Sequence, residues 1–326
     1  MSKGQVDESF KYIFGIIIGA MFLVFFIVFA WRYIAYAGSV SDADLATAID
    51  NDLVAFSVSE SAQHPISYSR DMDITIFEGK ITPKGLGYSK YTGKVIYSPL
   101  ELQGEEFYVA TKTWFLPYKV TNFFYITDKN TFYVIVYDQG SEKFKEEMVD
   151  GYSAMPDNFV FEAYEQNNLI DNMKALEEVT SGYEQVRFIF LTEQNFEPEL
   201  DDYSVISVTS TDEEFEYGKV NFEDGSSIYL SKEMLIGAFV AENKDAYDYN
   251  LELALEELQD ITTIYYEKSK FLSSRMPQCE YASVRTALNN YKSYIGDVES
   301  YTGYSSYVET VDKANKNLGG GCPEIF

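Results

Sequence analysis

Hydrophobic and polar positions divide the chain into one unbroken apolar run and many short segments after it. Between Tyr12 and Trp31 there are 20 residues with no Asp, Glu, Lys, Arg or His. A helix rises about 1.5 Å per residue, so this run would span roughly 30 Å, the thickness of a bilayer's hydrocarbon core. A helix that covers a soluble core has a polar face, and this run has none. The pattern predicts one transmembrane helix, with residues 12–31 in contact with membrane lipid.

The basic residues around the apolar run indicate its orientation. Lys3 and Lys11 precede it, and Arg32 is the one basic residue that follows before Arg70. This bias favours a cell-membrane protein with its N-terminus inside and its large C-terminal part extracytoplasmic. A cleaved secretory signal is the alternative, because Ala35-Tyr36-Ala37 resembles a small-x-small cleavage site. The apolar core is longer than the usual 7 to about 15 residues of such signals, which favours a retained anchor.

The residues ahead of the apolar run have a distinctive order. Lys3-Gly4 precedes Gln5, and acidic residues lie between Gln5 and the run. Over roughly residues 1–34 the chain resembles an archaeal class III, or type IV pilin-like, signal peptide. The resemblance implies cleavage between Gly4 and Gln5 and assembly through the apolar helix. That family usually has an acidic residue fifth in the mature chain, where this chain has Ser9. An ordinary signal anchor is the alternative.

Helical spacing resumes after the run. Ser41-Asp42 is a favourable helix start, and Leu45, Ile49 and Leu53 follow at helical intervals. We expect a short juxtamembrane helix here, followed by a Ser-rich linker that extends to residue 70.

Short β-branched and aromatic runs follow, and they predict strands. The expected strands are residues 74–77, 94–97, 107–111, 122–127, 131–137, 159–164, 186–191 and 203–208. Residues 122–127 and 131–137 are joined by Asp128-Lys129-Asn130 and are expected to form a hairpin, central in a sheet because both runs are almost wholly apolar. A second hairpin is expected between residues 215–222 and 227–230.

A helix over residues 168–183 separates the strands at 159–164 and 186–191. Strand, helix and strand in this order predict a βαβ unit with a right-handed crossover. No Gly-x-Gly-x-x-Gly opens it, so the pattern does not indicate dinucleotide binding.

The chain beyond Lys232 is expected to be helical. Met276-Pro277 ends one long helix, and the apolar seam of the next favours packing on a neighbouring helix. The two cysteines, Cys279 and Cys322, lie near the C-terminus. A straight helix between them would hold them roughly 60 Å apart, whereas a disulfide needs Cα atoms within about 7 Å. A break at Gly296-Asp297 or at Gly303 would allow a helical hairpin closed by a Cys279–Cys322 bond. Unpaired cysteines, or pairing with another chain, are the alternative.

These expectations define the fold class. We predict a transmembrane helix in residues 1–37, a juxtamembrane helix and linker in residues 38–70, an extracytoplasmic α/β domain in residues 71–240, and a C-terminal helical region in residues 241–326. The α/β domain is expected to hold a mixed sheet with the βαβ unit and β-hairpins.

Charge restricts the possible partners. The chain has 52 acidic and 25 basic side chains, a net charge of −27. Such a surface repels nucleic acid, so no nucleic-acid partner is expected. It attracts divalent cations, but no motif supports a cation site, and solubility alone explains the charge.

Catalytic and metal signatures are lacking in the sequence. His64 is the only histidine, no Gly-x-Ser-x-Gly elbow or Walker A motif occurs, and a zinc site would need more His and Cys ligands. Three acidic groups remain as candidate calcium ligands or glycosidase carboxylates, and we interpret them as solvated surface. They are Asp71 with Asp73, Glu199 with Asp201 and Asp202, and Asp212 with Glu213 and Glu214. No enzyme activity and no cofactor are expected.

The sequence therefore favours a membrane-anchored surface protein that acts by binding or assembly. Gly15 and Gly19 have the small-x-x-x-small spacing of packed membrane helices, which would suit a protein partner in the membrane. One alternative is a pilin-like subunit of a filament or secretion machine. Another is a solute-binding ectodomain with its pocket near residues 191–196 and 208–212, at the strand ends of the βαβ unit.

Overall fold

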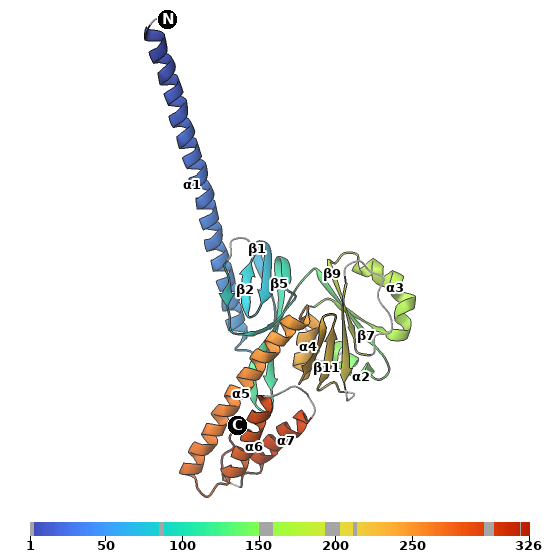
Figure 1. Cartoon of the computed structure of the whole chain (residues 1–326). Helices are drawn as coiled ribbons and strands as arrows, with labels where there is room; N and C mark the ends of the chain where they lie inside the picture. Colours follow the sequence, from blue (N-terminus) through green and yellow to red (C-terminus); the bar gives the residue numbers. More distant parts are fainter. Residues whose placement is uncertain are drawn as a thin grey trace.

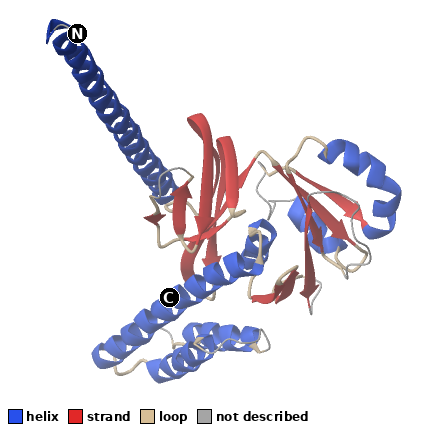
Figure 2. Ribbon diagram, turned by 45° about the horizontal axis from the view of Figure 1, so that its top comes forward, coloured by secondary structure: helices blue, strands red, loops and turns tan. Residues whose placement is uncertain are grey.

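The computed structural model describes residues 3–84, 88–149, 159–192, 203–210, 214–296, 303–319 and 321–326. It is a mixed α/β protein with two six-stranded mixed sheets, a long N-terminal helix and a group of C-terminal helices. Figure 1 shows the N-terminal helix projecting from one side of the molecule and the C-terminal helices on the other side, and Figure 2 shows the two sheets next to each other.

Helix α1 (Lys3–Phe56) is one continuous helix of 54 residues. Its length of about 80 Å follows from the rise per residue. The prediction of a separate juxtamembrane helix that begins at Ser41 is wrong. No proline lies between Lys3 and Phe56, and the glycine at position 38 costs a helix interior only about 1 kcal/mol. The expected boundary between residues 37 and 38 therefore falls inside α1.

The last turns of α1 dock on the first sheet. Ala46, Ile49 and Leu53 are buried in an apolar cluster with residues of strands β1, β2 and β5, and Leu53 is fully covered. Beside them, Asp50 Oδ1 lies 2.5 Å from Lys94 Nζ, just before β4. These contacts connect the apolar helix directly to the folded part of the chain, without a linker.

The first sheet has the order β3-β2-β1-β5-β6-β4. Its strands are β1 (Ser61–Phe77), β2 (Lys80–Pro83), β3 (Lys90–Tyr91), β4 (Val95–Tyr97), β5 (Glu101–Phe115) and β6 (Lys119–Asp128). β1 pairs with β5 over almost its whole length, with a register shift between Ser67 and Met72. The last part of the predicted linker, which extends to residue 70, is therefore strand. Its polar side chains show no strand pattern, because backbone hydrogen bonds to β5 hold this segment in the sheet.

The second sheet has the order β12-β11-β10-β9-β7-β8. Its strands are β7 (Thr131–Tyr137), β8 (Phe161–Glu165), β9 (Gln185–Phe190), β10 (Tyr203–Ser210), β11 (Gly218–Phe222) and β12 (Gly225–Tyr229). β8 and β9 both run parallel to β7, and β10 runs parallel to β9. Helices α2 (Glu142–Val149) and α3 (Gln166–Thr180) join these strands. They cover opposite faces, since Phe144 and Leu169 belong to different apolar clusters.

The predicted hairpin between residues 122–127 and 131–137 is wrong. Both segments are strands, but β6 lies in the first sheet between β5 and β4, and β7 lies in the second sheet between β9 and β8. Each strand is buried on both faces and is flanked by a strand on both edges, so each occupies an interior position of its own sheet. The second predicted hairpin is present, because β11 and β12 pair antiparallel.

The C-terminal helices are α4 (Lys232–Val240), α5 (Lys244–Arg275), α6 (Tyr281–Ile295) and α7 (Tyr304–Lys316). Ser231 and Asn243 cap the N-termini of α4 and α5 with their side chains. The largest apolar cluster contains residues of both sheets together with residues of all four helices. One core therefore holds the two sheets and the C-terminal helices together.

Candidate functional site

Among the residues that the structure describes, exposed large apolar side chains are concentrated on α1. Residues Ile16–Tyr33 form a helix long and apolar enough to cross a membrane, and none of this segment is buried. Side chains such as Phe25 and Trp31 are 62% and 80% exposed. The same segment is also compatible with a signal sequence. Large apolar side chains exposed over such a length indicate a surface that contacts lipid or other protein.

The residues of the predicted cleavage site and the two glycines predicted to pack against another membrane helix all lie on α1. Gly4 and Gln5 are in its first turns, and Gly15 and Gly19 are near or within the exposed apolar segment. A Cβ atom added at Gly19 would meet no atom within 4 Å, so the space beside this glycine is open. The side-chain surroundings of Gly4, Gln5 and Gly15 lie outside the described residues.

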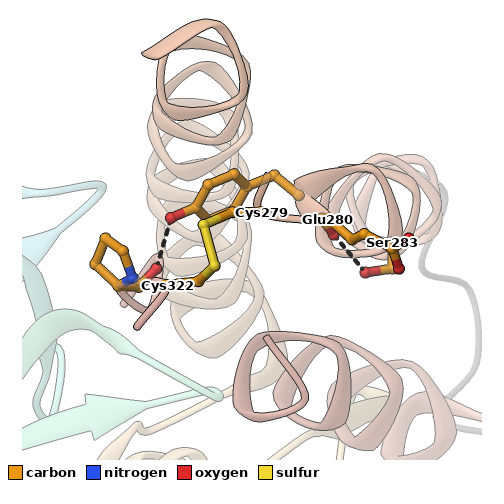
Figure 3. The surroundings of a disulfide bond; sticks show 6 residues. Cys279, Glu280, Ser283 and Cys322 are labelled. Atoms are coloured by element: carbon orange, nitrogen blue, oxygen red, sulfur yellow. Dashed lines mark hydrogen bonds between the residues drawn. A yellow bond between two sulfur atoms is a disulfide. The ribbon is translucent and has the colours of Figure 1, made fainter. Parts of the chain in front are cut away.

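Cys279 and Cys322 are joined by a disulfide, with their Cα atoms 5.7 Å apart. Figure 3 shows the bond between the segment before α6 and the segment after α7. Beside it, Tyr281 Oη donates a hydrogen bond of 2.9 Å to the Pro323 carbonyl oxygen. The chain terminus is held further by Asn315, whose Oδ1 accepts from the backbone N–H of Ile325 at 2.7 Å. The two cysteines thus fasten the C-terminus to the start of α6.

Two of the acidic candidates that the structure describes, Asp73 and Glu214, form ordinary ion pairs. Asp73 and Glu101 both pair with Lys84, and Asp71 is exposed. Glu214 pairs with Lys143 at 2.6 Å, and this lysine lowers the pKa of Glu214. The remaining acidic candidates, Glu199, Asp201, Asp202, Asp212 and Glu213, lie outside the described residues.

His64 has a structural neighbour. Its ring stacks on Phe56 with ring centroids 5.4 Å apart, which links the end of α1 to β1. Within the described part of the chain, no group of three or more His, Cys, Asp or Glu side chains is arranged to hold a metal ion.

A cavity of about 240 Å³ lies at the amino ends of β9 and β10, where the sequence pattern predicted no pocket. Its wall consists of Gln185, Val186, Arg187, Tyr203, Ser204 and Glu242. The expected pocket was at the opposite, carboxyl ends of these strands, and part of that region is outside the described residues. There, Thr192 Oγ1 donates to Asp138 Oδ2 at 3.1 Å, and Ser141 also bonds Asp138, so these polar groups satisfy one another.

Arg187 is the feature of this cavity that a sequence signal could have revealed. It is the one charged residue in the apolar strand Val186–Leu191. A charge at such a position is expected to have specific partners, because burial of an unpartnered charge is costly. Glu242 gives no such signal, because it follows α4 in an acidic chain.

Comparisons with known proteins gave no relative. No family model, no curated protein and no solved structure matches this chain.

Proposed function

We propose that this chain is a single-pass membrane-anchored surface protein that acts by binding or assembly. The observation that carries the proposal is the wholly exposed apolar segment Ile16–Tyr33, continuous with a helix whose last turns are buried against the first sheet. A retained membrane helix would hold the sheets at a set distance from the bilayer. The basic flank at Lys3 and Lys11 supports an orientation with the sheets on the extracytoplasmic side.

The C-terminal disulfide supports the same location. A bond between Cys279 and Cys322 persists outside the cytosol, where thiols are not kept reduced. We further propose that α6 and α7 act as a helical hairpin closed by this bond, and that β8, α3 and β9 form a βαβ crossover. In this arrangement the C-terminal helices lie away from the apolar end of α1 (Figure 1) and would face possible partners.

A pilin-like subunit of a filament or secretion machine is the second candidate. The continuity of α1 favours it, because assembly through an apolar helix needs that helix to be rigidly joined to the folded part. The open space at Gly19 would allow close approach of another helix. This candidate requires cleavage between Gly4 and Gln5.

The first experiment is the intact mass and N-terminal residue of protein purified from native membranes. An intact N-terminus in the membrane fraction is the result expected for a plain anchor. A chain that begins at Gln5 would establish pilin-type processing. A chain that begins at Gly38 would show that the apolar segment is removed, and this outcome would overturn the proposal of a membrane anchor.

Substitution inside the apolar segment tests the anchor directly. Phe22→Asp with Phe26→Asp places two charges on one side of the helix, and each is expected to cost about 2.5–3.5 kcal/mol of insertion free energy. We expect the variant to leave the membrane fraction. Val54→Asp is the matched control on the same helix, since Val54 is 50% exposed and lies beyond the apolar segment. Membrane retention of the double variant would contradict the proposal.

A further inference from the structure

Arg187 on β9 is a buried cation. It is 2% exposed, and its Nη1 atom donates to three backbone carbonyl oxygens at the end of α4. Nη1 lies 3.1, 2.6 and 2.8 Å from the carbonyl oxygens of Phe239, Val240 and Ala241. These carbonyls carry the partial negative charge of a helix C-terminus. Nε donates to Ser204 Oγ at 3.1 Å. Two of the three guanidinium nitrogens are therefore engaged.

The third nitrogen, Nη2, has no hydrogen-bond acceptor in the part of the chain that the structure describes. No carboxylate of the described residues lies within ion-pair distance of the guanidinium. Arg187 lines the cavity of about 240 Å³ at the amino ends of β9 and β10. The guanidinium thus contributes an unused donor group beside open space. Arginine stays charged in this position, so the cavity has a permanent cation in its wall.

Glu242 supplies a carboxylate to the same cavity. Its Oε2 atom accepts a hydrogen bond of 2.8 Å from the backbone N–H of Leu100, which holds the side chain in place. Burial lowers the pKa of Arg187, and electrostatic interactions with Tyr133 first, and then with Glu242 and Glu223, oppose that effect. Arg187 and Glu242 therefore line one cavity without forming an ion pair with each other.

This charge arrangement selects the class of ligand. A simple anion would be attracted by Arg187 but repelled by Glu242 and Glu223. A simple cation would be repelled by the guanidinium. A molecule that has both charges can pair with Arg187 and with Glu242. The volume of the cavity is close to the lower end of the range for ligand pockets, about 300 Å³. The cavity therefore suits a small molecule.

We propose that the cavity between Arg187 and Glu242 binds a small zwitterion of the α-amino acid class. The ligand carboxylate accepts from Arg187 Nη2, and its ammonium group donates to Glu242. Gln185, Tyr203 and Ser204 line the remaining wall and are available to polar groups of the ligand. This site keeps the solute-binding alternative but differs from it in place, because that pocket was expected near residues 191–196 and 208–212, and it does not depend on the membrane anchor.

Calorimetric titration of the full-length protein in detergent tests the site. Each standard L-amino acid is titrated separately, and the tightest binder is compared with its deaminated acid and its decarboxylated amine. We expect at least one amino acid to bind and both truncated forms to bind at least tenfold more weakly. No binding by any amino acid would overturn the proposal. Equal binding of the deaminated acid would also overturn it, because the site would then recognise an anion alone.

Variants distinguish this cavity from another binding place on the protein. Glu242→Gln keeps an oxygen acceptor for Leu100 but removes the charge, and we expect at least tenfold weaker binding. Glu177→Gln on the exposed face of α3 is the matched control and should bind as the wild type does. Unchanged affinity of Glu242→Gln would overturn the proposal even if an amino acid binds. A soluble, cleaved chain would defeat the anchor but leave this titration unaffected, so the two failures are distinguishable.

Discussion

The Asp128 carboxylate accepts a hydrogen bond from the backbone N–H of Gln103, with Oδ2 and the nitrogen 3.0 Å apart. Its other oxygen, Oδ1, accepts from the backbone N–H of Asn130 and from Thr131 Oγ1, each at 3.0 Å. Asp128 ends β6, and Thr131 begins β7. One buried carboxylate therefore organises the point where the chain passes from the first sheet to the second.

Replacement of Asp128 by Ala is expected to destabilise the fold. It would remove the shared acceptor of the Gln103 and Asn130 backbone N–H groups and of the buried Thr131 hydroxyl, and a buried donor left without its acceptor costs about 1–3 kcal/mol. Urea denaturation of the full chain in detergent measures the change in the free energy of unfolding. Asp71→Ala is the control, since Asp71 is exposed. Equal stability of the two variants would show that this carboxylate does not stabilise the passage between the sheets.

Gly237 in α4 is expected to tolerate no larger residue. A Cβ atom there would lie 2.6 Å from the ring of Tyr97, which is fully buried and stacks on Tyr125 and Tyr247. Gly237→Ala should lower the free energy of unfolding by about 1–3 kcal/mol, even though Ala favours helices. Gly182→Ala is the control, because nothing lies within 4 Å of its added Cβ. A Gly237→Ala protein as stable as wild type would contradict the close contact.

The disulfide is expected to contribute substantially to stability. Cys279 and Cys322 are 43 residues apart in sequence, and in the chain-entropy model closing such a loop stabilises the fold by about 4 kcal/mol. The double variant Cys279→Ser, Cys322→Ser should unfold at lower urea concentration than the oxidised wild type. Reductant should lower the midpoint of the wild type and leave that of the variant unchanged. A reductant effect on the variant would assign the loss to something other than this bond.

Stability should fall at alkaline pH because of buried tyrosines. Burial raises the pKa of Tyr133 to about 12, and it raises the pKa values of Tyr125 and Tyr247 well above the ordinary value. A raised pKa in the folded state means that the neutral phenol is stabilised by folding. This contribution is complete below about pH 10, the unfolded value, and is lost as the pH rises toward the folded value.

Urea midpoints measured across the alkaline range, together with tyrosinate absorbance, check this prediction. The midpoint should stay level up to about pH 10 and then decrease as tyrosinate forms on unfolding. A midpoint independent of pH, with all tyrosines titrating while the fold persists, would show that these phenols are accessible to solvent.

The local sequence pattern was sufficient to predict most individual helices and strands. The alternation of apolar and turn residues predicted β9, β10 and the β11–β12 hairpin, and helical periodicity predicted α3 close to its observed bounds and the end of α5. The uncharged run predicted the exposed apolar helix. These features depend on neighbours in sequence, because side-chain periodicity reflects the geometry of the local backbone.

The sequence by itself determined the apolar span, many of the helices and strands, and the acidic character of the chain. The tertiary structure alone decided that β6 and β7 belong to different sheets, because a strand that is apolar on both faces offers the same backbone hydrogen bonds to any neighbour. It also decided that α1 continues through Gly38 into the docked turns, since packing of Leu53 outweighs one unfavourable helix residue. The cavity between Arg187 and Glu242 exists only because α4 ends against β9, and two residues that are 55 positions apart have no local signal for that contact.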